Sequence, residues 1–204
     1  MDEKNFTKLW DSLYIITRCF KPSKQEDCIA FYNFFESFKF LLPNPKLRYL
    51  LMVYMDNVPI TQCDRDFNVR WVIGLNNYMC RFTRTIIQDD YNTICKKYNP
   101  SKITKTQWGN SLWYLIHYIA IHQPTILTQE IAYSFKVMME CLTYLLPCDI
   151  CKGHLKQHLQ NFPIYNYLRT NESVFEWTFI LHNKVNMSLN KPVLNYKDAR
   201  DLYI

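Results

Sequence analysis

Two cysteines separated by two residues, Cys148 and Cys151, have the strongest claim to chemistry in this chain. They follow Pro147, which is expected to end one helix, so the pair opens the next helix. A helix N-terminus carries unsatisfied N–H groups and a partial positive charge, and both stabilise a thiolate. The thiolate is the nucleophile of disulfide exchange, and this spacing puts both sulfur atoms on one helical turn. The spacing therefore predicts a redox-active disulfide.

The histidines that follow the pair leave a second chemistry open. The segment offers four soft ligands of the kind that bind zinc, namely Cys148, Cys151, His154 and His158. On a continuous helix, however, Cys148 and His158 would lie about 15 Å apart. Zinc bonds of about 2.0–2.3 Å cannot gather both, and only Gly153 offers a break in the helix. No metal ligand is therefore predicted, and a zinc-binding or redox-inactive interaction module is the alternative to a redox enzyme.

The overall composition favours an all-helical globular chain. The 204 residues are 49% hydrophobic and 21% charged, which argues against a disordered chain. There are three glycines, where average usage of about 7% would give about fourteen. Folds rich in tight turns need more glycine, and the phosphate-binding loops GxGxxG and GxxxxGKS/T are absent. Any nucleotide would therefore be held by helices and side chains.

Charge and cysteine content narrow the class further. The net charge of +6 comes without a block of Lys and Arg, so nucleic acid is not an expected partner. The N-terminus shows no signal peptide, and no apolar run is long enough to predict a transmembrane helix. The chain has eight cysteines, of which Cys80, Cys95 and Cys141 are expected to be buried free thiols.

Helical periodicity extends along the chain, and no strand is predicted. The expected helices cover residues 27–42, 46–56, 64–97, 107–122, 128–146, a shorter stretch from about 148, and 171–189. Prolines close to their ends mark the boundaries, namely Pro43, Pro100, Pro147 and Pro192. Asn171 is the expected N-cap of the last helix.

The two halves of the chain resemble one another. Three landmarks recur in the same order: Trp10-(3)-Tyr14 and Trp113-(3)-His117, Phe40-Leu41-Leu42-Pro43 and Tyr144-Leu145-Leu146-Pro147, and Trp71-(3)-Leu75-Asn76-Asn77 and Trp177-(3)-Leu181-His182-Asn183. Any two amphipathic helices share apolar positions, but three landmarks at near-constant separation favour a duplication. We therefore expect two helical domains, residues 1–100 and 101–204.

Three segments of the second half resemble the Erv/ALR family of FAD-linked sulfhydryl oxidases, in the order and spacing of that family. The segments are Gly109-Asn110-Ser111-Leu112-Trp113-Tyr114-Leu115-Ile116-His117, Pro147-Cys148-x-x-Cys151-x-x-His154, and Trp177-(3)-Leu181-His182-Asn183-x-Val185-Asn186-(2)-Leu189-x-Lys191-Pro192. The resemblance implies an all-α fold, an Erv-type four-helix bundle plus a short fifth helix. Residues 1–100 would be a degenerate pseudo-Erv domain without a CxxC and without flavin.

The resemblance also implies roles for individual residues. Cys148 would exchange with a protein dithiol substrate, and Cys151 would lie beside the flavin. The residues implied to bind FAD are Gly109, Asn110, Trp113, His117, Cys151, His182, Asn183, Val185, Asn186 and Lys191. Two substrate thiols would become a disulfide, and O₂ would become hydrogen peroxide. A second cysteine pair often delivers electrons in this family, and Cys19 with Cys28 is the best-placed pair here, with a structural disulfide or two free thiols as the alternatives.

Departures from the family pattern are also expected to matter. A cysteine pair common in the family would fall at Phe179 and Tyr196, so packing is expected to replace that disulfide. Asn110 and Leu146 stand where an arginine and a tyrosine are common. The family's C-terminal tryptophan has no match, and Tyr203 is the nearest aromatic residue.

The pairing of a pseudo-Erv half with an Erv half within one chain resembles the quiescin-type oxidases and, more closely, baculovirus-type viral enzymes. That resemblance implies intrachain packing of the two halves, possible homodimers, and a location in the host cytoplasm or nucleus and the virion. The mitochondrial intermembrane space is the alternative location.

Overall fold

Helices dominate the computed structural model, which describes residues 3–83 and 89–203. They are α1 (Glu3–Cys19), α2 (Gln25–Leu41), α3 (Pro45–Asn57), α4 (Arg65–Thr83), α5 (Tyr91–Lys97), α6 (Lys105–Ile121), α7 (Gln129–Leu145), α8 (Asp149–Asn161), α9 (Asn171–Ser188) and α10 (Tyr196–Asp201). Within the described ranges, the other regular elements are a 3-10 turn, Ile164–Tyr167, and one isolated antiparallel bridge between Ile126 and Thr170. The all-α fold class is confirmed.

Two details of the predicted helices are wrong. The long stretch expected over residues 64–97 is divided into α4 and α5, and residues 84–88 of it lie outside the described residues. The N-cap of α9 is Thr170, not Asn171, because the Thr170 hydroxyl accepts the Ser173 N–H in a capping box. The Asn171 side chain instead donates to the Ile121 carbonyl at 3.0 Å, which ties the start of α9 to the end of α6.

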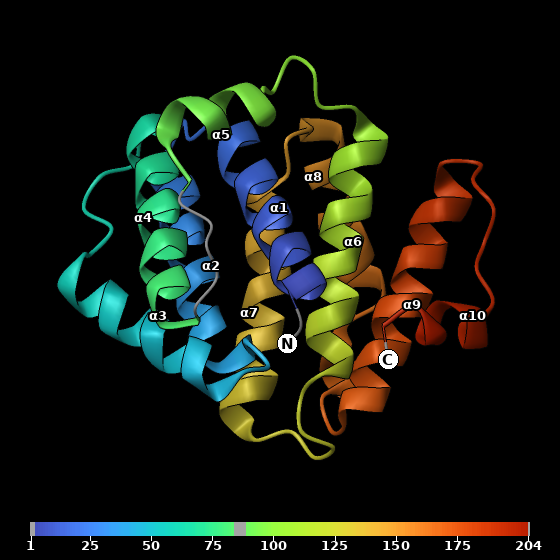
Figure 1. Cartoon of the computed structure of the whole chain (residues 1–204). Coiled ribbons are helices and arrows are strands. Elements are labelled where there is room, and N and C mark those ends of the chain that lie inside the picture. The colour runs from blue at the N-terminus through green and yellow to red at the C-terminus, as the bar shows by residue number, and fades with distance from the viewer. Residues whose placement is uncertain (1–2, 84–88, 204) are drawn as a thin grey trace.

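The two halves of the chain pack through equivalent helices. The most extensive helix contacts join α2 to α7 and α1 to α6, while α4 packs on α1 and α9 packs on α6 (Figure 1). A single hydrophobic core spans both halves and includes Phe35 and Leu41 from α2, Phe135 from α7, and Phe175 and Trp177 from α9. The halves therefore share a core and do not bury separate ones.

The sequence repeat has counterparts in the hydrogen bonds. The indole N–H of Trp71 donates to the carbonyl of Val58 at 2.7 Å, and that of Trp177 donates to the carbonyl of Phe162 at 3.1 Å. Val58 is the C-cap of α3 and Phe162 is the C-cap of α8. The same buried polar group therefore satisfies the end of the equivalent helix in each half.

An asparagine side chain makes a second repeated contact. Asn77 accepts from the Asp89 backbone N–H at 2.9 Å and donates to the Asp89 carbonyl at 2.8 Å. Asn183 accepts from the Leu194 N–H at 3.0 Å and donates to the Leu194 carbonyl at 3.1 Å. Asp89 and Leu194 each lie two residues before a short helix, α5 and α10 respectively. We call these two pairs the asparagine clamps, because each fixes the backbone that returns toward the bundle.

The cysteine pairing outside the CxxC differs from the expectation. Cys28 pairs with Cys63, not with Cys19, and the bridge joins the first turn of α2 to the loop before α4. Cys19 is a buried free thiol, and burial raises its pKa. Sequence alone did not identify Cys63, because its 35-residue separation from Cys28 carries no local signal.

The prediction of buried free thiols is confirmed for Cys80 and Cys141, whereas Cys95 is free but not fully buried. Cys80, Cys95 and Cys141 are free thiols. Cys80 and Cys141 are buried, whereas Cys95 is half-buried. Burial raises the pKa of Cys141 to about 12, so its thiolate form is scarce at neutral pH.

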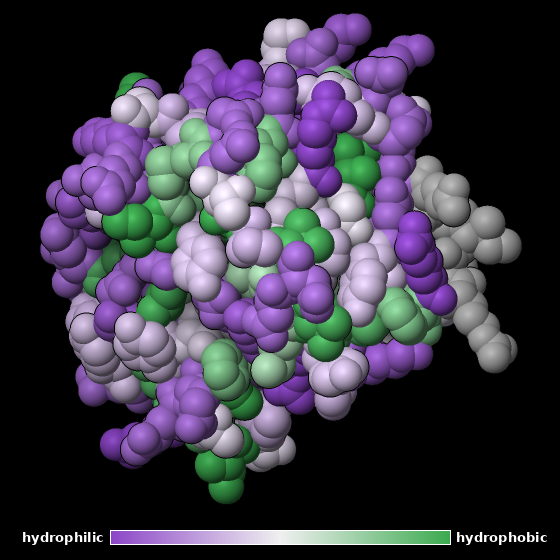
Figure 2. Space-filling model, turned by 90° about the vertical axis from the view of Figure 1, so that its left-hand side faces the viewer, coloured by the Kyte–Doolittle hydropathy of each residue, from purple (hydrophilic) through white to green (hydrophobic). Residues whose placement is uncertain are grey.

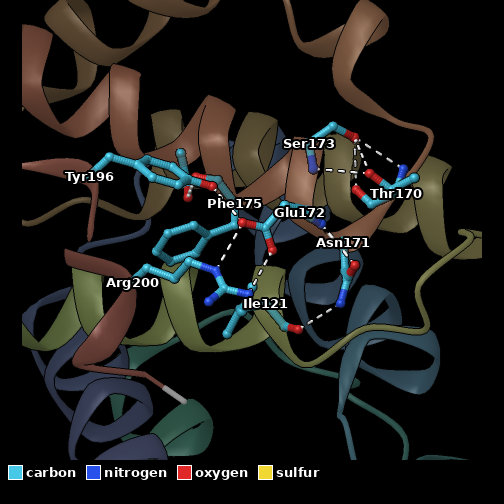
Figure 3. A network of polar contacts seen from close by, with 9 residues as sticks. Ile121, Thr170, Asn171, Glu172, Ser173, Phe175, Tyr196 and Arg200 are labelled. Atoms are coloured by element: carbon cyan, nitrogen blue, oxygen red, sulfur yellow. Dashed lines mark hydrogen bonds and ion pairs between the residues drawn. The ribbon is translucent and has the colours of Figure 1, made fainter. Parts of the chain in front are cut away.

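The helix α10 is held against α9 by a small polar network (Figure 3). The Glu172 carboxylate accepts from the Tyr196 hydroxyl at 2.7 Å and from two guanidinium nitrogens of Arg200 at 2.9 and 3.3 Å. Tyr196 then meets Phe179 edge to face, with ring centroids 5.1 Å apart. An aromatic contact therefore joins the two positions at which the family resemblance implied a missing cysteine pair.

On the face of α3 and α4, hydrophilic side chains surround small separate apolar patches (Figure 2). Exposed apolar side chains in these helices include Met52 and Phe82. Within residues 3–83 and 89–203, no helix combines the length and apolar character needed to cross a membrane.

Candidate redox and cofactor site

Cys148 and Cys151 form a disulfide bond at the N-terminus of α8. Cys148 is the N-cap residue, and its Sγ accepts the Cys151 N–H at 3.3 Å. Both side chains are half-buried, and that of Cys151 packs against the hydrophobic core. The sulfur of Cys148 therefore lies in the positive field of the helix end, where a released thiolate is stabilised.

The helix α8 continues unbroken past Gly153, which removes the condition for a zinc site. Among the residues that the structure describes, no group of three or more His, Cys, Asp or Glu side chains is gathered to hold a metal ion. Cys148 and Cys151 are also bound to each other, whereas zinc requires thiolates. The geometry thus favours redox chemistry over metal binding.

A cavity of about 430 Å³ opens beside this disulfide, between α6, α8 and α9. Its lining includes most residues that the sequence predicted: Gly109, Asn110, Trp113, Cys148, Cys151, His182, Val185, Asn186 and Lys191. A larger hollow of about 700 Å³ lies between α2, α7 and α8, but neither cysteine of the CxxC lines it. The smaller cavity is the candidate site, because it contains the reactive groups.

Two predicted residues, His117 and Asn183, do not line the cavity. His117 is 2% exposed and lies behind His182, with its Nε2 3.0 Å from Nδ1 of His182. Asn183 forms the asparagine clamp on Leu194, which does line the cavity. Both residues thus shape the wall of the cavity from behind.

Sequence reasoning missed a second set of lining residues. These residues include Trp108, Ile116, Ile150, Leu155, His158 and Leu194. Trp108 and Ile116 lie eight residues apart in the expected 107–122 helix and so share one helical face, which periodicity could have identified. Tyr203 is absent from the cavity lining and instead lies 5.3 Å from the His117 ring, which places it behind the wall.

Burial keeps both histidines of the wall neutral. It lowers the pKa of His117 to about 3, with a smaller contribution from His182. Burial, followed by the charge of Lys191, lowers the pKa of His182 to about 4. The His182 ring stacks on Trp113 with centroids 4.1 Å apart and planes inclined by 9°. The wall therefore presents a flat, uncharged aromatic surface at neutral pH.

The rim of the cavity is apolar and carries cationic side chains. Three aliphatic side chains that line it are exposed, namely Ile150 (71%), Leu189 (53%) and Leu194 (41%). Lys105 and Lys191 add positive charge to the same lining. Exposed apolar groups around a concave site are typical of a surface that a ligand covers. The lining fits a cofactor with an aromatic ring system and negatively charged groups.

The fold and the site thus define an all-helical protein with a disulfide at a helix N-terminus beside an aromatic cavity. Residues 110–203 match the family model described as the Erv1 / Alr family. The C-terminal half of the chain is thus similar to the Erv1/Alr family.

Individual relatives match the same half. The chain is 31% identical over 94 residues to a probable FAD-linked sulfhydryl oxidase of Acanthamoeba polyphaga mimivirus, a match covering 46% of this chain and 66% of that protein. It is 32% identical over 91 residues to an FAD-linked sulfhydryl oxidase of Oryza sativa subsp. japonica, covering 45% and 46%. It is 28% identical over 102 residues to that of an African swine fever virus isolate, covering 47% and 79%. The chain thus spans less than two thirds of the first two relatives.

A solved structure extends the likeness to both halves. The sulfhydryl oxidase fragment of human QSOX1 superposes with a TM-score of 0.57 at 17% identity, covering 97% of this chain and 81% of the fragment. At this identity, the likeness concerns the fold alone. Since nearly the whole chain is covered, the N-terminal helices are part of that shared fold.

Proposed function

We propose that this chain is an FAD-linked thiol oxidase that forms disulfides in protein substrates. The observation that supports this most strongly is the Cys148–Cys151 disulfide, placed at the end of α8 and in the lining of an aromatic cavity. The family match and the viral and plant relatives named FAD-linked sulfhydryl oxidases point to the same chemistry.

The two cysteines have different tasks in this proposal. A substrate thiolate attacks Sγ of Cys148, forms a mixed disulfide and releases the Cys151 thiolate. A second substrate thiolate attacks the substrate sulfur of the mixed disulfide and releases the Cys148 thiolate, which the Cys151 N–H and the helix end stabilise. One substrate disulfide forms, two protons leave and the CxxC is reduced.

The residues of the cavity fit FAD. Trp113 and His182 offer a flat stacking surface, and Lys105 and Lys191 offer charges for its phosphates. The exposed aliphatic rim would be covered by the cofactor. When bound, FAD supplies the acceptor for two electrons from the dithiol and passes them to O₂, which gives hydrogen peroxide.

We further propose that residues 1–100 form a pseudo-Erv half that binds no flavin and supports residues 101–204. The repeated indole bonds and asparagine clamps support a common origin of the halves. Asn44 and Leu47 stand where the repeat would place the two cysteines, so this half has no electron path of its own.

The experiment is a visible absorption spectrum of the purified chain, followed by oxygen uptake with a dithiol substrate. A flavin spectrum, turnover and hydrogen peroxide in equal amount to the disulfide formed are expected. A colourless protein that does not take up added FAD would refute the proposal. Stoichiometric zinc bound through Cys148 and Cys151 would establish the alternative of an interaction module.

We also propose that the protein acts during viral infection, in the host cytoplasm or nucleus and in the virion. Relatives in mimivirus and African swine fever virus support this location, whereas a mitochondrial relative from Saccharomyces cerevisiae supports the intermembrane space. Fractionation of infected cells with an antibody against the chain distinguishes the two. Sedimentation of the purified protein tests whether it forms a homodimer.

A further inference from the structure

Three hydrogen-bonded side chains lead from the packed interior between α6 and α9 to the wall of the cavity. The Thr178 hydroxyl lies 2.8 Å from Nδ1 of His117, and Nε2 of His117 lies 3.0 Å from Nδ1 of His182. Thr178 is fully buried and His117 is nearly so, which means that water does not compete for these bonds. His182 alone reaches the cavity. Hydrogen bonds within the protein therefore determine which ring nitrogen of each histidine carries the proton.

One short contact determines which group donates and which accepts in each of these hydrogen bonds. The Thr178 hydroxyl lies 2.7 Å from the backbone carbonyl oxygen of Phe175. A carbonyl oxygen only accepts, so the single hydroxyl proton points to it. The hydroxyl can then only accept from His117, whose proton must be on Nδ1. The bare Nε2 of His117 in turn requires a proton on Nδ1 of His182.

We propose that Thr178 and His117 are positioning residues that fix His182 as its Nδ1–H tautomer, so that Nε2 presents a lone pair to the cavity and accepts a hydrogen bond from the cofactor. The identity of that cofactor rests on the proposed function, whereas the tautomer does not. FAD offers N–H and O–H donors on its flavin ring, its ribityl chain, its ribose and its adenine.

Two further observations support this arrangement. The stack on Trp113 fixes the plane of the His182 ring, which gives the lone pair one direction. Burial holds the pKa of both rings well below 6.5, so neither ring carries a second proton at neutral pH. A protonated or Nε2–H His182 would present a donor to the cavity instead.

The first test is nitrogen NMR of the histidine rings in the flavin-free full chain at neutral pH. The signals of the other three histidines, His122, His154 and His158, are assigned with single glutamine variants. Nδ1–H tautomers are expected on both His117 and His182. An Nε2–H tautomer or a charged ring at either position would overturn the proposal. If the protein binds no FAD, the proposed function fails, but this measurement still determines the tautomer.

The second test uses variants of the buried hydroxyl. Thr178→Val removes the acceptor of the His117 proton, so that proton is expected to move to Nε2 of His117. The His182 proton is then expected on Nε2 of His182. FAD binding is expected to weaken about tenfold, which is the size expected for a lost buried hydrogen bond. Thr178→Ser keeps the hydroxyl and is expected to restore both readouts.

The matched control is Thr17→Val, because Thr17 is also fully buried and donates to an α1 backbone carbonyl, that of Leu13, at 2.8 Å. This control is expected to leave the tautomers and FAD affinity unchanged. Unchanged tautomers in Thr178→Val, or equal FAD loss in both valine variants, would show that Thr178 has only a packing role.

Discussion

The two halves of the molecule differ at one equivalent place in the fold, which is an open cavity in one half and almost filled in the other. In the C-terminal half, a cavity of about 430 Å³ is lined by Leu112, Trp113, Ile116, Leu146 and Leu155. In the N-terminal half, the residues that the sequence repeat aligns with them, Leu9, Trp10, Leu13, Leu42 and Leu51, surround a void of about 10 Å³. Equivalent residues therefore line both places, but only the C-terminal half has a cavity between them.

The difference arises at a few side chains. Phe35 and Phe38 line the small void, and both are almost fully buried. The Asp89 carboxylate accepts from the Tyr14 hydroxyl and from the Asn76 amide, each at 2.6 Å. By the repeat, Tyr14 and Asn76 correspond to His117 and His182. In the N-terminal half, a carboxylate and aromatic rings of the chain itself therefore occupy the region that corresponds to the cavity wall of the other half.

The helix caps repeat this contrast. Asn44 caps α3 and accepts the Leu47 N–H at 3.4 Å, as Cys148 caps α8 and accepts the Cys151 N–H at 3.3 Å. Leu47 is 2% exposed, so the place of the second cysteine is part of the core. Cap geometry is thus independent of redox chemistry, which requires sulfur at both positions.

The largest expected effect is on turnover, and it is expected for only one of the two disulfides. Cys151→Ser removes the leaving group of exchange with Cys148, so turnover of a dithiol substrate is expected to fall by at least about a thousandfold. The double variant Cys28→Ser/Cys63→Ser is the control and is expected to retain turnover while folded. Oxygen uptake measures both. A comparable loss in the double variant would assign electron transfer to the N-terminal bridge as well.

The second prediction concerns stability. Because Cys28 and Cys63 close a loop with a sequence separation of 35, removal of their bridge is expected to lower the free energy of unfolding. The expected loss is about 3–4 kcal/mol, mainly because the unfolded chain gains freedom. Urea unfolding of the wild type and the double variant measures it. A midpoint unchanged from wild type would contradict a stabilising role for this bridge.

The third prediction compares the two asparagine clamps. Asn183→Ala frees Leu194 at the cavity rim, so FAD binding is expected to weaken about tenfold. Asn77→Ala frees Asp89 in the N-terminal half and is expected to lower stability by about 1–3 kcal/mol without changing FAD affinity. Fluorescence titration with FAD, together with urea unfolding, distinguishes them. Equal FAD loss in both variants would remove the functional contrast between the halves.

The fourth prediction concerns the pH dependence of the C-terminal histidine pair. Burial lowers the pKa of His117 to about 3 and that of His182 to about 4, so the unfolded chain takes up these protons first as pH falls. The stability of the neutral pair is complete above the unfolded pKa of about 6.5 and is lost as pH falls from there toward the folded values of about 4 and 3.

Urea midpoints at pH 7 and pH 5 measure this loss. A His117→Gln/His182→Asn variant is expected to flatten the difference between the two midpoints. Tyr14 and Asn76, at the equivalent positions, do not titrate in this range, since burial and then Asp89 raise the Tyr14 pKa above its ordinary value. An equal pH dependence in the variant would place the acid sensitivity elsewhere.

Local patterns predicted the parts of this protein that depend on neighbours in the sequence. Prolines and apolar periodicity gave most helices, and the residues before and after Cys148 gave the N-terminal position of the pair. The family resemblance, which depends on ordered spacing, named nine residues that the structure brings to one cavity. His117 and Asn183 were named as lining residues but lie behind it, because their hydrogen-bond partners come from distant segments.

Local sequence patterns could not predict the contacts between segments that are distant along the chain. Cys63 as the partner of Cys28, Thr178 as the anchor of His117 and the Asp89 carboxylate at Tyr14 each join residues that are far apart along the chain. No period or spacing encodes such pairs.

The sequence by itself determined an all-helical chain, its internal repeat and a cysteine pair at a helix N-terminus, because these depend on local propensity and order. The tertiary structure alone decided how the equivalent place in the N-terminal half is filled. That outcome depends on how large side chains and one carboxylate pack among helices that are otherwise equivalent, and packing is a property of the folded whole.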